Sequence, residues 1–291
     1  MNFGDLEFGF KISRKTIPLI VRETCLAIWN VIQPQEIPFP TKELWLEKSK
    51  EFYEITQFPN CIGSIDGKHI RIICPPNSGS EYFNYKKYFS IVLLAVADAN
   101  YYFTAVDIGS FGREGDSTIF KKSNFGLRLK NNELDLPADN PLPVPDNVEQ
   151  GSEVPYVLLG DEAFGLSKHV MRPYPSKGLS QEKRIYNYRH CRARRVVECS
   201  FGILSNKWRV LHSSMLIHPE FAVIVVQACC VLHNFVRRRD GYLFEDTLTC
   251  PLQDVQESAV VGGMSKGIDV REVFCQYFNG SGALSWQNKY V

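Results

Sequence analysis

Several common signatures are missing from this sequence, and each absence excludes a class of protein. No two of the nine cysteines have the CxxC spacing of a thiolate zinc site. No internal repeat or sorting tag is visible. The longest apolar run, residues 221–236, is interrupted by Gln227, His233 and Asn234. We therefore expect a buried helix with core polar residues there, and no membrane span.

The cysteines also carry little sign of function. Their number is odd, no secretory leader is visible, and none has a neighbourhood that indicates a nucleophile. We expect a reducing compartment, in which these cysteines act as small apolar side chains of the core.

Net charge is nearly absent as well, at +1, but the charge is unevenly distributed. Residues 177–209 contain nine Lys or Arg against Glu182 and Glu198, whereas residues 131–155 contain six acidic residues and no basic one. Because a polyanion responds to local charge, the basic stretch predicts a surface that can bind nucleic acid.

The length of 291 residues, with 44% apolar and 22% charged residues, indicates a folded α/β protein. We predict an N-terminal helical segment at 1–57, a main domain at 58–240 with an acidic surface loop at 131–153, and a loosely held tail at 241–291 that contains one helix near 270–278. Apolar residues three and four apart predict a helix over 13–29, after the short segment 6–12. This pattern is typical of a helix-turn-helix whose first helix is incomplete, or of a helix that packs against the main domain.

The main domain begins with three strands, predicted at 61–74, 90–97 and 101–108, with Asp98 in the turn of the hairpin. A helix follows over 117–130, then a buried strand over 154–160, and then amphipathic helices over 192–211 and 219–239. A strand that follows a helix indicates a parallel addition to the sheet. The order is that of a ribonuclease H-like domain: a mixed sheet flanked by helices.

Three acidic residues fit one metal site in such a fold. Asp66 and Asp161 follow apolar strand segments, and Glu198 lies on the helix over 192–211 beside Arg194 and Arg195. Carboxylate oxygens suit Mg²⁺ or Mn²⁺, and two such cations activate a water and stabilise the leaving oxygen of a phosphodiester. The two arginines would then bind neighbouring phosphates.

Each residue also has an ordinary structural interpretation. Asp66 precedes a glycine and fits a β-bulge, Asp161 fits a turn, and Glu198 fits an ion pair at the edge of a core. Asp116 fits the N-cap of the helix over 117–130. For Lys68 and His69 we expect a surface position, although both could assist at the first strand.

Four motifs in order give a resemblance: GSIDGKH at 63–69, GSFGREGDS at 109–117, LGDEAF at 159–164 and RRVVECSFG at 194–202, with LHNF at 232–235 near the end. The series resembles that of PIF/Harbinger-type transposases and the nuclease-like proteins derived from them, over about residues 12–240. The resemblance implies a DDE-type nuclease in which Asp66, Asp161 and Glu198 are the catalytic acids. Asp116 matches a further acidic position among the family's metal ligands.

The resemblance implies a nuclear protein that cuts DNA phosphodiesters with two divalent cations, Mg²⁺ or Mn²⁺, and that receives its DNA from a Myb-like partner. The incomplete N-terminal segment supports an alternative, a domesticated and catalytically silent protein that binds DNA or a protein partner. Retained acidic residues favour the nuclease.

Overall fold

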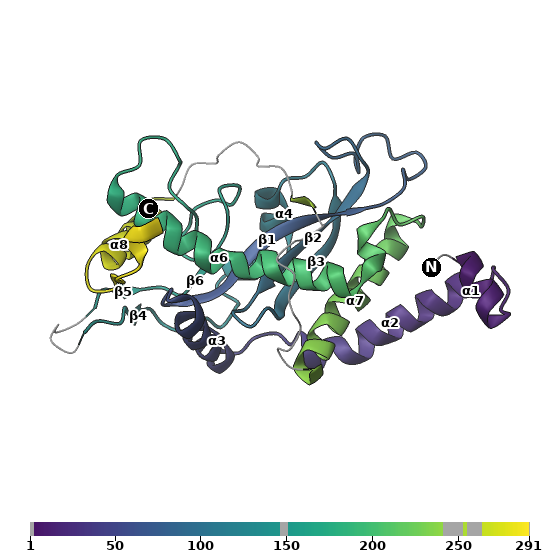
Figure 1. Ribbon diagram of the computed structural model, residues 1–291, viewed down its shortest axis with the longest axis horizontal. Coiled ribbons are helices and arrows are strands. Elements are labelled where there is room, and N and C mark those ends of the chain that lie inside the picture. Colours follow the sequence, from purple (N-terminus) through teal and green to yellow (C-terminus); the bar gives the residue numbers. More distant parts are fainter. Residues whose placement is uncertain (1–2, 146–150, 241–252, 255–263, 291) are drawn as a thin grey trace.

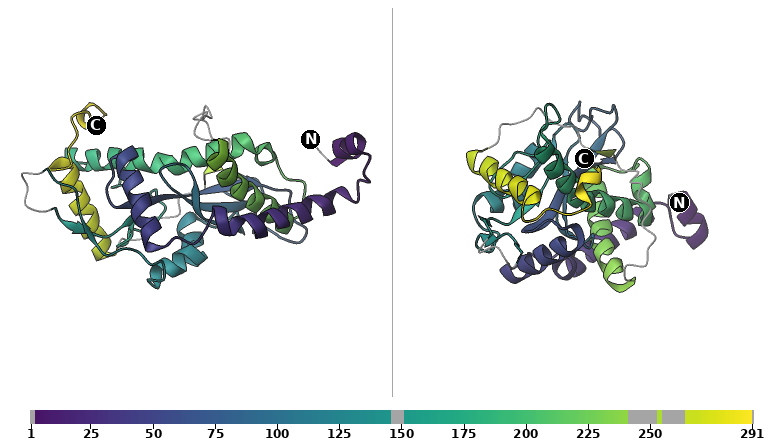
Figure 2. Two further views of the ribbon diagram at one scale, coloured as in Figure 1. Left: turned by 90° about the horizontal axis from the view of Figure 1, so that it is seen from below. Right: turned by 60° about the vertical axis from the view of Figure 1, so that its left-hand side comes forward.

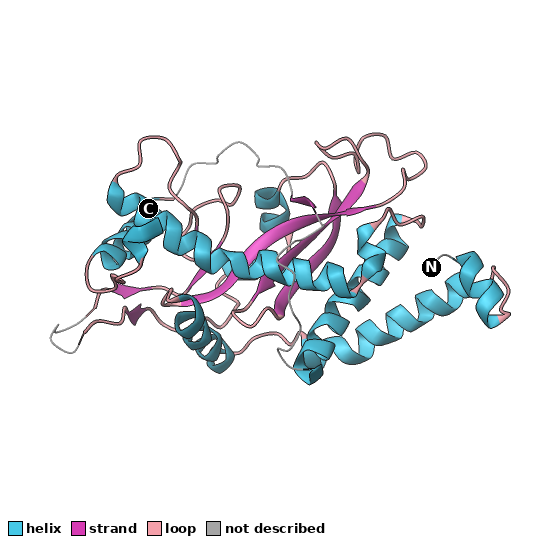
Figure 3. Cartoon of the chain, viewed as in Figure 1, coloured by secondary structure: helices cyan, strands magenta, loops and turns pink. Residues whose placement is uncertain are grey.

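The structure is a computed structural model that describes residues 3–145, 151–240, 253–254 and 264–290 (Figure 1). Helices flank a mixed sheet (Figure 3). The strands of this sheet are β1 (Cys61–Arg71), β2 (Ser90–Ala97), β3 (Phe103–Phe111), β6 (Val157–Leu159), β7 (Val170–Met171) and β8 (Gln253–Asp254). The helices are α1 (Phe3–Phe10), α2 (Ile17–Glu36), α3 (Lys42–Thr56), α4 (Asp116–Lys122), α5 (Asn124–Lys130), α6 (Gln181–Lys207), α7 (Pro219–Asp240) and α8 (Ser265–Asn279).

The strand order β3-β2-β1-β6-β7 confirms the expected ribonuclease H-like arrangement. β1, β2 and β3 are antiparallel neighbours, and β6 joins β1 in parallel, as predicted for a strand that follows a helix. β8 pairs with the far half of β1. Two strands of the sheet therefore share one edge of β1, with β6 ending opposite Ser64 and β8 pairing with Lys68 and His69.

Both faces of the sheet are covered, which explains why β2 is buried at every position and apolar from Ile91 to Ala97. Ile91, Leu93 and Ala95 point into a hydrophobic cluster shared with α6, α7 and α8, whereas Val92 and Leu94 point into a second cluster with α4 and α5. Figure 2 shows α6 running along one side of the sheet with α4 on the other. The long helix α6 therefore lies on one defined face of β1.

Several helix boundaries differ from the sequence prediction. The helix expected over 117–130 is two helices, because Ser123 has the extended backbone angle ψ 151° and its hydroxyl accepts a hydrogen bond from the Gly126 N–H at the start of α5. The helix expected over 192–211 is α6, which begins at Gln181, eleven residues before Arg192, because the Ser180 hydroxyl caps it by accepting a hydrogen bond from the Lys183 N–H. The first turns of α6 are polar, so apolar periodicity could not reveal where the helix begins.

The segments outside the main domain are held more closely than predicted. α8 covers the expected helix at 270–278, but Phe274 and Phe278 are fully buried in the main core, so the description of 264–290 as a loose tail was wrong. The rest of the expected tail, 241–252 and 255–263, lies outside the described residues. The segment 131–153 carries a short ladder of β4 (Asn140–Pro141) with β5 (Glu153–Val154).

The N-terminal segment is helical as predicted, but the helix expected over 13–29 runs over Ile17–Glu36, and the segment before it forms α1. α2 packs against α7, and α3 packs against β1, whereas α1 lies at the projecting end of α2 (Figure 1). The domain boundaries at 57 and 240 stay predictions.

Helix α7 is long and apolar enough, by length and composition, to cross a membrane. It lies against α2 and β3, and its residues Ala222, Val226 and Cys230 are buried in the core. These contacts account for its apolar sequence as that of a core helix.

Candidate metal centre

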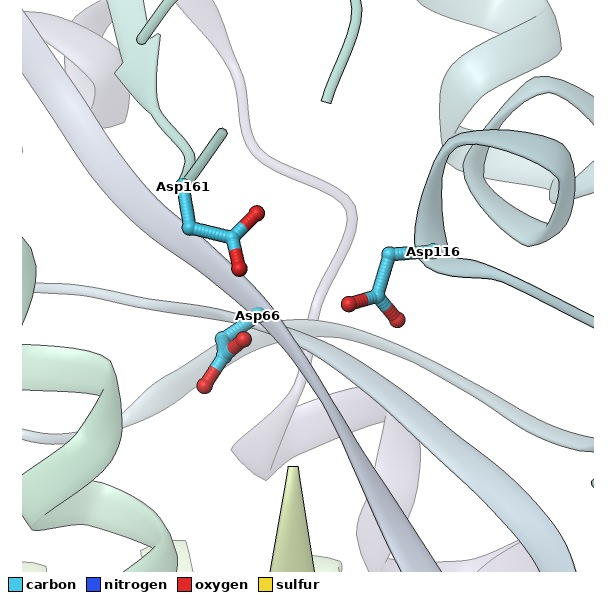
Figure 4. Close-up of side chains that lie close together, drawn as sticks. All are labelled: Asp66, Asp116 and Asp161. Carbon is cyan, nitrogen blue, oxygen red and sulfur yellow. The ribbon is translucent and has the colours of Figure 1, made fainter. Parts of the chain in front are cut away.

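Three aspartates from separate elements meet beside β1. Asp66 lies in the middle of β1, Asp161 follows β6, and Asp116 is the first residue of α4. One carboxylate oxygen from each lies within 4.8 Å of the others, and the three side chains approach one another in Figure 4. Asp66 and Asp116 are buried, whereas Asp161 is half-buried. The site is therefore a compact group of acids with one side open to solvent.

The sheet itself creates the space for this group. One edge of β1 pairs with β6 up to Ser64 and with β8 from Lys68 onward. Between these two positions, beside Asp66, no strand of the described residues pairs with this edge. β6 ends because the chain turns sharply at Gly160, where a Cβ atom would lie 2.7 Å from the Phe164 ring. Asp161 stabilises this turn, since its Oδ1 accepts a hydrogen bond from the Ala163 N–H. Asp161 thus forms the predicted turn and also belongs to the acidic group.

Asp116 belongs to the centre rather than to a helix cap. The N-cap position of α4 is occupied by Gly115, and the Asp116 side chain is completely buried. Its carboxylate lies at the positive end of α4, where a helix stabilises negative charge. The ordinary interpretation of Asp116 as the N-cap was wrong.

Glu198 is outside the group formed by the three aspartates. Its Oε1 accepts a hydrogen bond from an Arg194 nitrogen at 2.6 Å, and the Glu198 side chain is 39% exposed. Glu198 nevertheless lies on the helix that covers the Asp66 face of β1. On that face, Ser64 donates to the Ala193 carbonyl of α6 at 3.1 Å, and the Lys68 ammonium lies 5.7 Å from the centre of the Phe201 ring.

Arg194 connects Glu198 electrostatically with the aspartates. Burial lowers its pKa, but the negative charges of Asp66, Glu198 and Asp161 outweigh burial and raise the pKa above its ordinary value. The neighbouring Arg195 is exposed, on a different side of the helix. Only Arg195 of the two predicted phosphate-binding arginines is therefore open to solvent.

Lys68 is the residue that sequence reasoning misplaced. The surface position expected for Lys68 and His69 was wrong, because their exposures are 4% and 2%. The Lys68 ammonium lies 3.5 Å from Oδ2 of Asp66, and the His69 Nδ1 atom lies 2.9 Å from the Ser90 hydroxyl. The alternation of β1 was a usable signal, since Lys68 shares a face with Ile70, which is buried.

The donor set fits a hard divalent cation. Carboxylate oxygens are the ligands that Mg²⁺ and Mn²⁺ prefer, and three acids this close repel one another strongly unless a cation lies between them. Thiolate and imidazole ligands, which softer metals prefer, are not part of this group.

The geometry is that of an acidic group that could hold a divalent cation beside a ribonuclease H-like sheet, and comparison with known proteins gives the family. The family described as DDE superfamily endonuclease matches residues 65–234, so the chain belongs to it. DDE endonuclease domains use divalent metals.

The named relatives agree with the resemblance to Harbinger-type nucleases. The chain is 27% identical over 234 residues to the Arabidopsis thaliana "Protein ALP1-like", which covers 75% of this chain and 54% of that protein. It is 26% identical over 227 residues to the Homo sapiens "Putative nuclease HARBI1", which covers 77% of this chain and 59% of that protein. The Arabidopsis protein "Antagonist of like heterochromatin protein 1" is 27% identical over 227 residues, or 75% of this chain and 56% of that protein.

The chain thus spans between half and two thirds of the length of these relatives. No solved structure matches it significantly.

Proposed function

We propose that the protein is a DNA endonuclease that depends on Mg²⁺ or Mn²⁺ and works by the two-metal mechanism of DDE transposases. The observation that carries the proposal is the approach of Asp66, Asp116 and Asp161, whose ligand oxygens lie within 4.8 Å although the residues lie far apart in the chain. Membership of an endonuclease family and the nuclease names among the relatives support DNA as the substrate.

In this proposal each acid has a defined task. Asp66, Asp116 and Asp161 would hold the cations, and Glu198 would complete the ligand set from α6. The bound cations would lower the pKa of an attacking water, or of a DNA 3′-hydroxyl in strand transfer, and stabilise the leaving oxygen. Lys68 keeps the Asp66 carboxylate in place through their buried ion pair.

The basic residues of α6 would bind the DNA backbone. Arg195 is exposed next to the half-buried Arg194, and the stretch 177–209 carries an excess of positive charge. Because phosphates supply most of the affinity for DNA, binding through this surface should weaken steeply as salt is raised.

Nicking of supercoiled plasmid by the purified chain with Mn²⁺ tests the proposal. We expect nicking by the wild type and a loss of at least about a hundredfold in D66N, D116N and D161N, since each variant removes a charged ligand. Asp107→Asn is the matched control, because Asp107 is a half-buried carboxyl of β3 outside the acidic group. Nicking by D66N equal to that of D107N would reject the site.

A catalytically silent DNA- or protein-binding factor is the second candidate. It is favoured by one observation, the capture of Glu198 by Arg194 in the metal-free geometry. Salt-sensitive DNA binding without metal-stimulated cleavage of any substrate would support it over the nuclease.

We also propose a nuclear location and a Myb-like partner that delivers the DNA. Both follow from the resemblance to Harbinger-type proteins. Co-purification of a Myb-like protein with the tagged chain from nuclear extract is the observation to seek.

A further inference from the structure

The ion pair between Arg194 and Glu198 has an unusual distribution of burial. In most exposed pairs on a helix both side chains reach into solvent, but here the Arg194 side chain is only 18% exposed and Glu198 is 39% exposed. The guanidinium therefore lies deeper than the carboxylate, on the side of α6 that faces the aspartates. Its distance to Glu198, 2.6 Å, is that of a strong charge-assisted hydrogen bond.

The charges around the site explain what holds the guanidinium there. The three aspartates and Glu198 carry four formal negative charges, and Lys68 and Arg194 return two positive ones, so the metal-free site keeps a formal charge of about −2. One divalent cation balances this negative charge while Lys68 and Arg194 both stay in the site. A second divalent cation adds charge that the site accepts only if a side-chain cation withdraws.

Of the two side-chain cations, Arg194 is the one that can withdraw. Lys68 is 4% exposed and enclosed between Asp66 and the Phe201 ring, whereas the Arg194 side chain is 18% exposed and can therefore turn toward solvent. Glu198, which pairs with Arg194, is also the one predicted metal ligand that lies outside the group formed by the three aspartates.

We propose that Arg194 is a positioning residue that occupies the place of the second cation beside Glu198 in the metal-free protein, and that it releases Glu198 only when that cation binds. This inference rests on the proposed metal-dependent function. In this inference the two cations differ in how they bind. The three aspartates bind the first cation, whereas competition with Arg194 sets the affinity for the second. The released guanidinium is then available to a DNA phosphate, so that the assembly of the complete site and the binding of substrate would be coupled.

Isothermal titration with Mn²⁺ in the absence of DNA tests this without reference to activity. We expect the wild type to bind Mn²⁺ in one tighter and one weaker class. Arg194→Gln should strengthen the weaker class by about tenfold, because it removes a competing charge a few ångströms from Glu198. Arg195→Gln changes the net charge equally from the exposed side of α6, and it should leave both classes within about twofold.

Two further variants separate charge from structure. Arg194→Lys keeps the positive charge, so its weaker class should stay within about threefold of the wild type. Glu198→Gln should abolish the weaker class and keep the tighter one, and it keeps the inference testable if R194Q does not fold. Thermal unfolding in EDTA should show a lower melting temperature for R194Q than for R195Q, and saturating Mn²⁺ should remove most of that difference.

The outcomes distinguish the two proposals. If D66N binds Mn²⁺ as the wild type does, the proposed metal centre fails. If D66N loses Mn²⁺ binding but R194Q and R195Q have the same weaker class, or E198Q retains it, the centre stands and the role assigned to Arg194 is overturned.

Discussion

Two histidines show how strongly this fold penalises a buried positive charge. His190 and His233 are 1% and 3% exposed, and the Nε2 of each lies within hydrogen-bond distance of a backbone carbonyl, that of Met171 or Tyr101. Burial lowers the pKa of His190 to about 3, with the nearby Arg194 charge as a lesser cause, and that of His233 to about 4. Both histidines are therefore neutral in the folded protein at physiological pH.

This neutrality predicts a loss of stability in mild acid. Each folded-state pKa lies below the unfolded value of about 6.5, so the stabilisation is complete above pH 6.5 and is lost as the pH falls toward 4. Between pH 7 and pH 5 each histidine should lower the free energy of unfolding by about 2 kcal/mol. Urea denaturation at the two pH values measures this. His190→Gln should remove its share of the pH dependence, and the exposed His212→Gln should keep all of it.

Single residues of the site differed in how well sequence could place them. Asp161 could be placed because it follows the apolar strand β6. Asp66 lies in the middle of β1 rather than at a strand end, and the two meet because β6 ends opposite Ser64. Asp116 lies in the acidic group and Glu198 lies outside it. The sequence could not predict this difference, since both residues lie on helices and local sequence does not fix where a helix meets the sheet. Lys68 was misplaced because a lysine is rarely buried unless a partner from elsewhere on the face neutralises it.

Among the elements, α7 is joined to both β3 and α2 by the side chain of Asn234. The Asn234 Oδ1 atom accepts from the Phe103 N–H of β3, and its Nδ2 group donates to the carbonyls of Phe103 and Glu36. Asn234 thus satisfies backbone groups at the start of β3 and at the end of α2 from a single position of α7. The sequence indicated a core polar pair at 233–234, and the structure confirms it, but the partners lie more than 130 residues away and could not be predicted.

Asn234→Ala should therefore destabilise the protein more than the loss of a single side-chain amide usually does. It leaves buried backbone groups on two other elements without partners, and we expect the free energy of unfolding to fall by about 2–4 kcal/mol. Asn124→Ala is the control, because Asn124 is exposed and its side-chain oxygen accepts a hydrogen bond from the half-buried Arg128 on the same helix. Equal urea midpoints for the two variants would show that Asn234 does not fix α7.

At the scale of the whole molecule, the described end of the chain is part of the core. Phe274 of α8 packs against Phe58, with ring centres 5.1 Å apart, and both are fully buried in the cluster that also contains α6 and α7. Strand order and the two-faced cover of the sheet could be predicted from apolar periodicity. The docking of α8 could not, because the apolar residues of a short amphipathic helix do not reveal which surface they cover.

Phe274→Ala tests whether α8 unfolds together with the rest. We expect a loss of about 3–5 kcal/mol in a single cooperative transition, because a large cavity forms inside the common core. Ile268→Ala on the same helix is the comparison, since Ile268 is 47% exposed and should cost far less. An early, separate transition in F274A, with the main transition unmoved, would mean that α8 is an independent appendage.

Helix α6 also limits how the protein can move. Its 27 residues form one uninterrupted rod, roughly 40 Å long, that carries both Arg194 and Glu198 while its buried stripe anchors it along the sheet. A rod held along its whole length cannot swing like a hinged flap. Exchange of partners at Glu198 is therefore a matter of rotamers, with a few torsions turning on a stationary backbone, and it belongs to the fast end of protein motions.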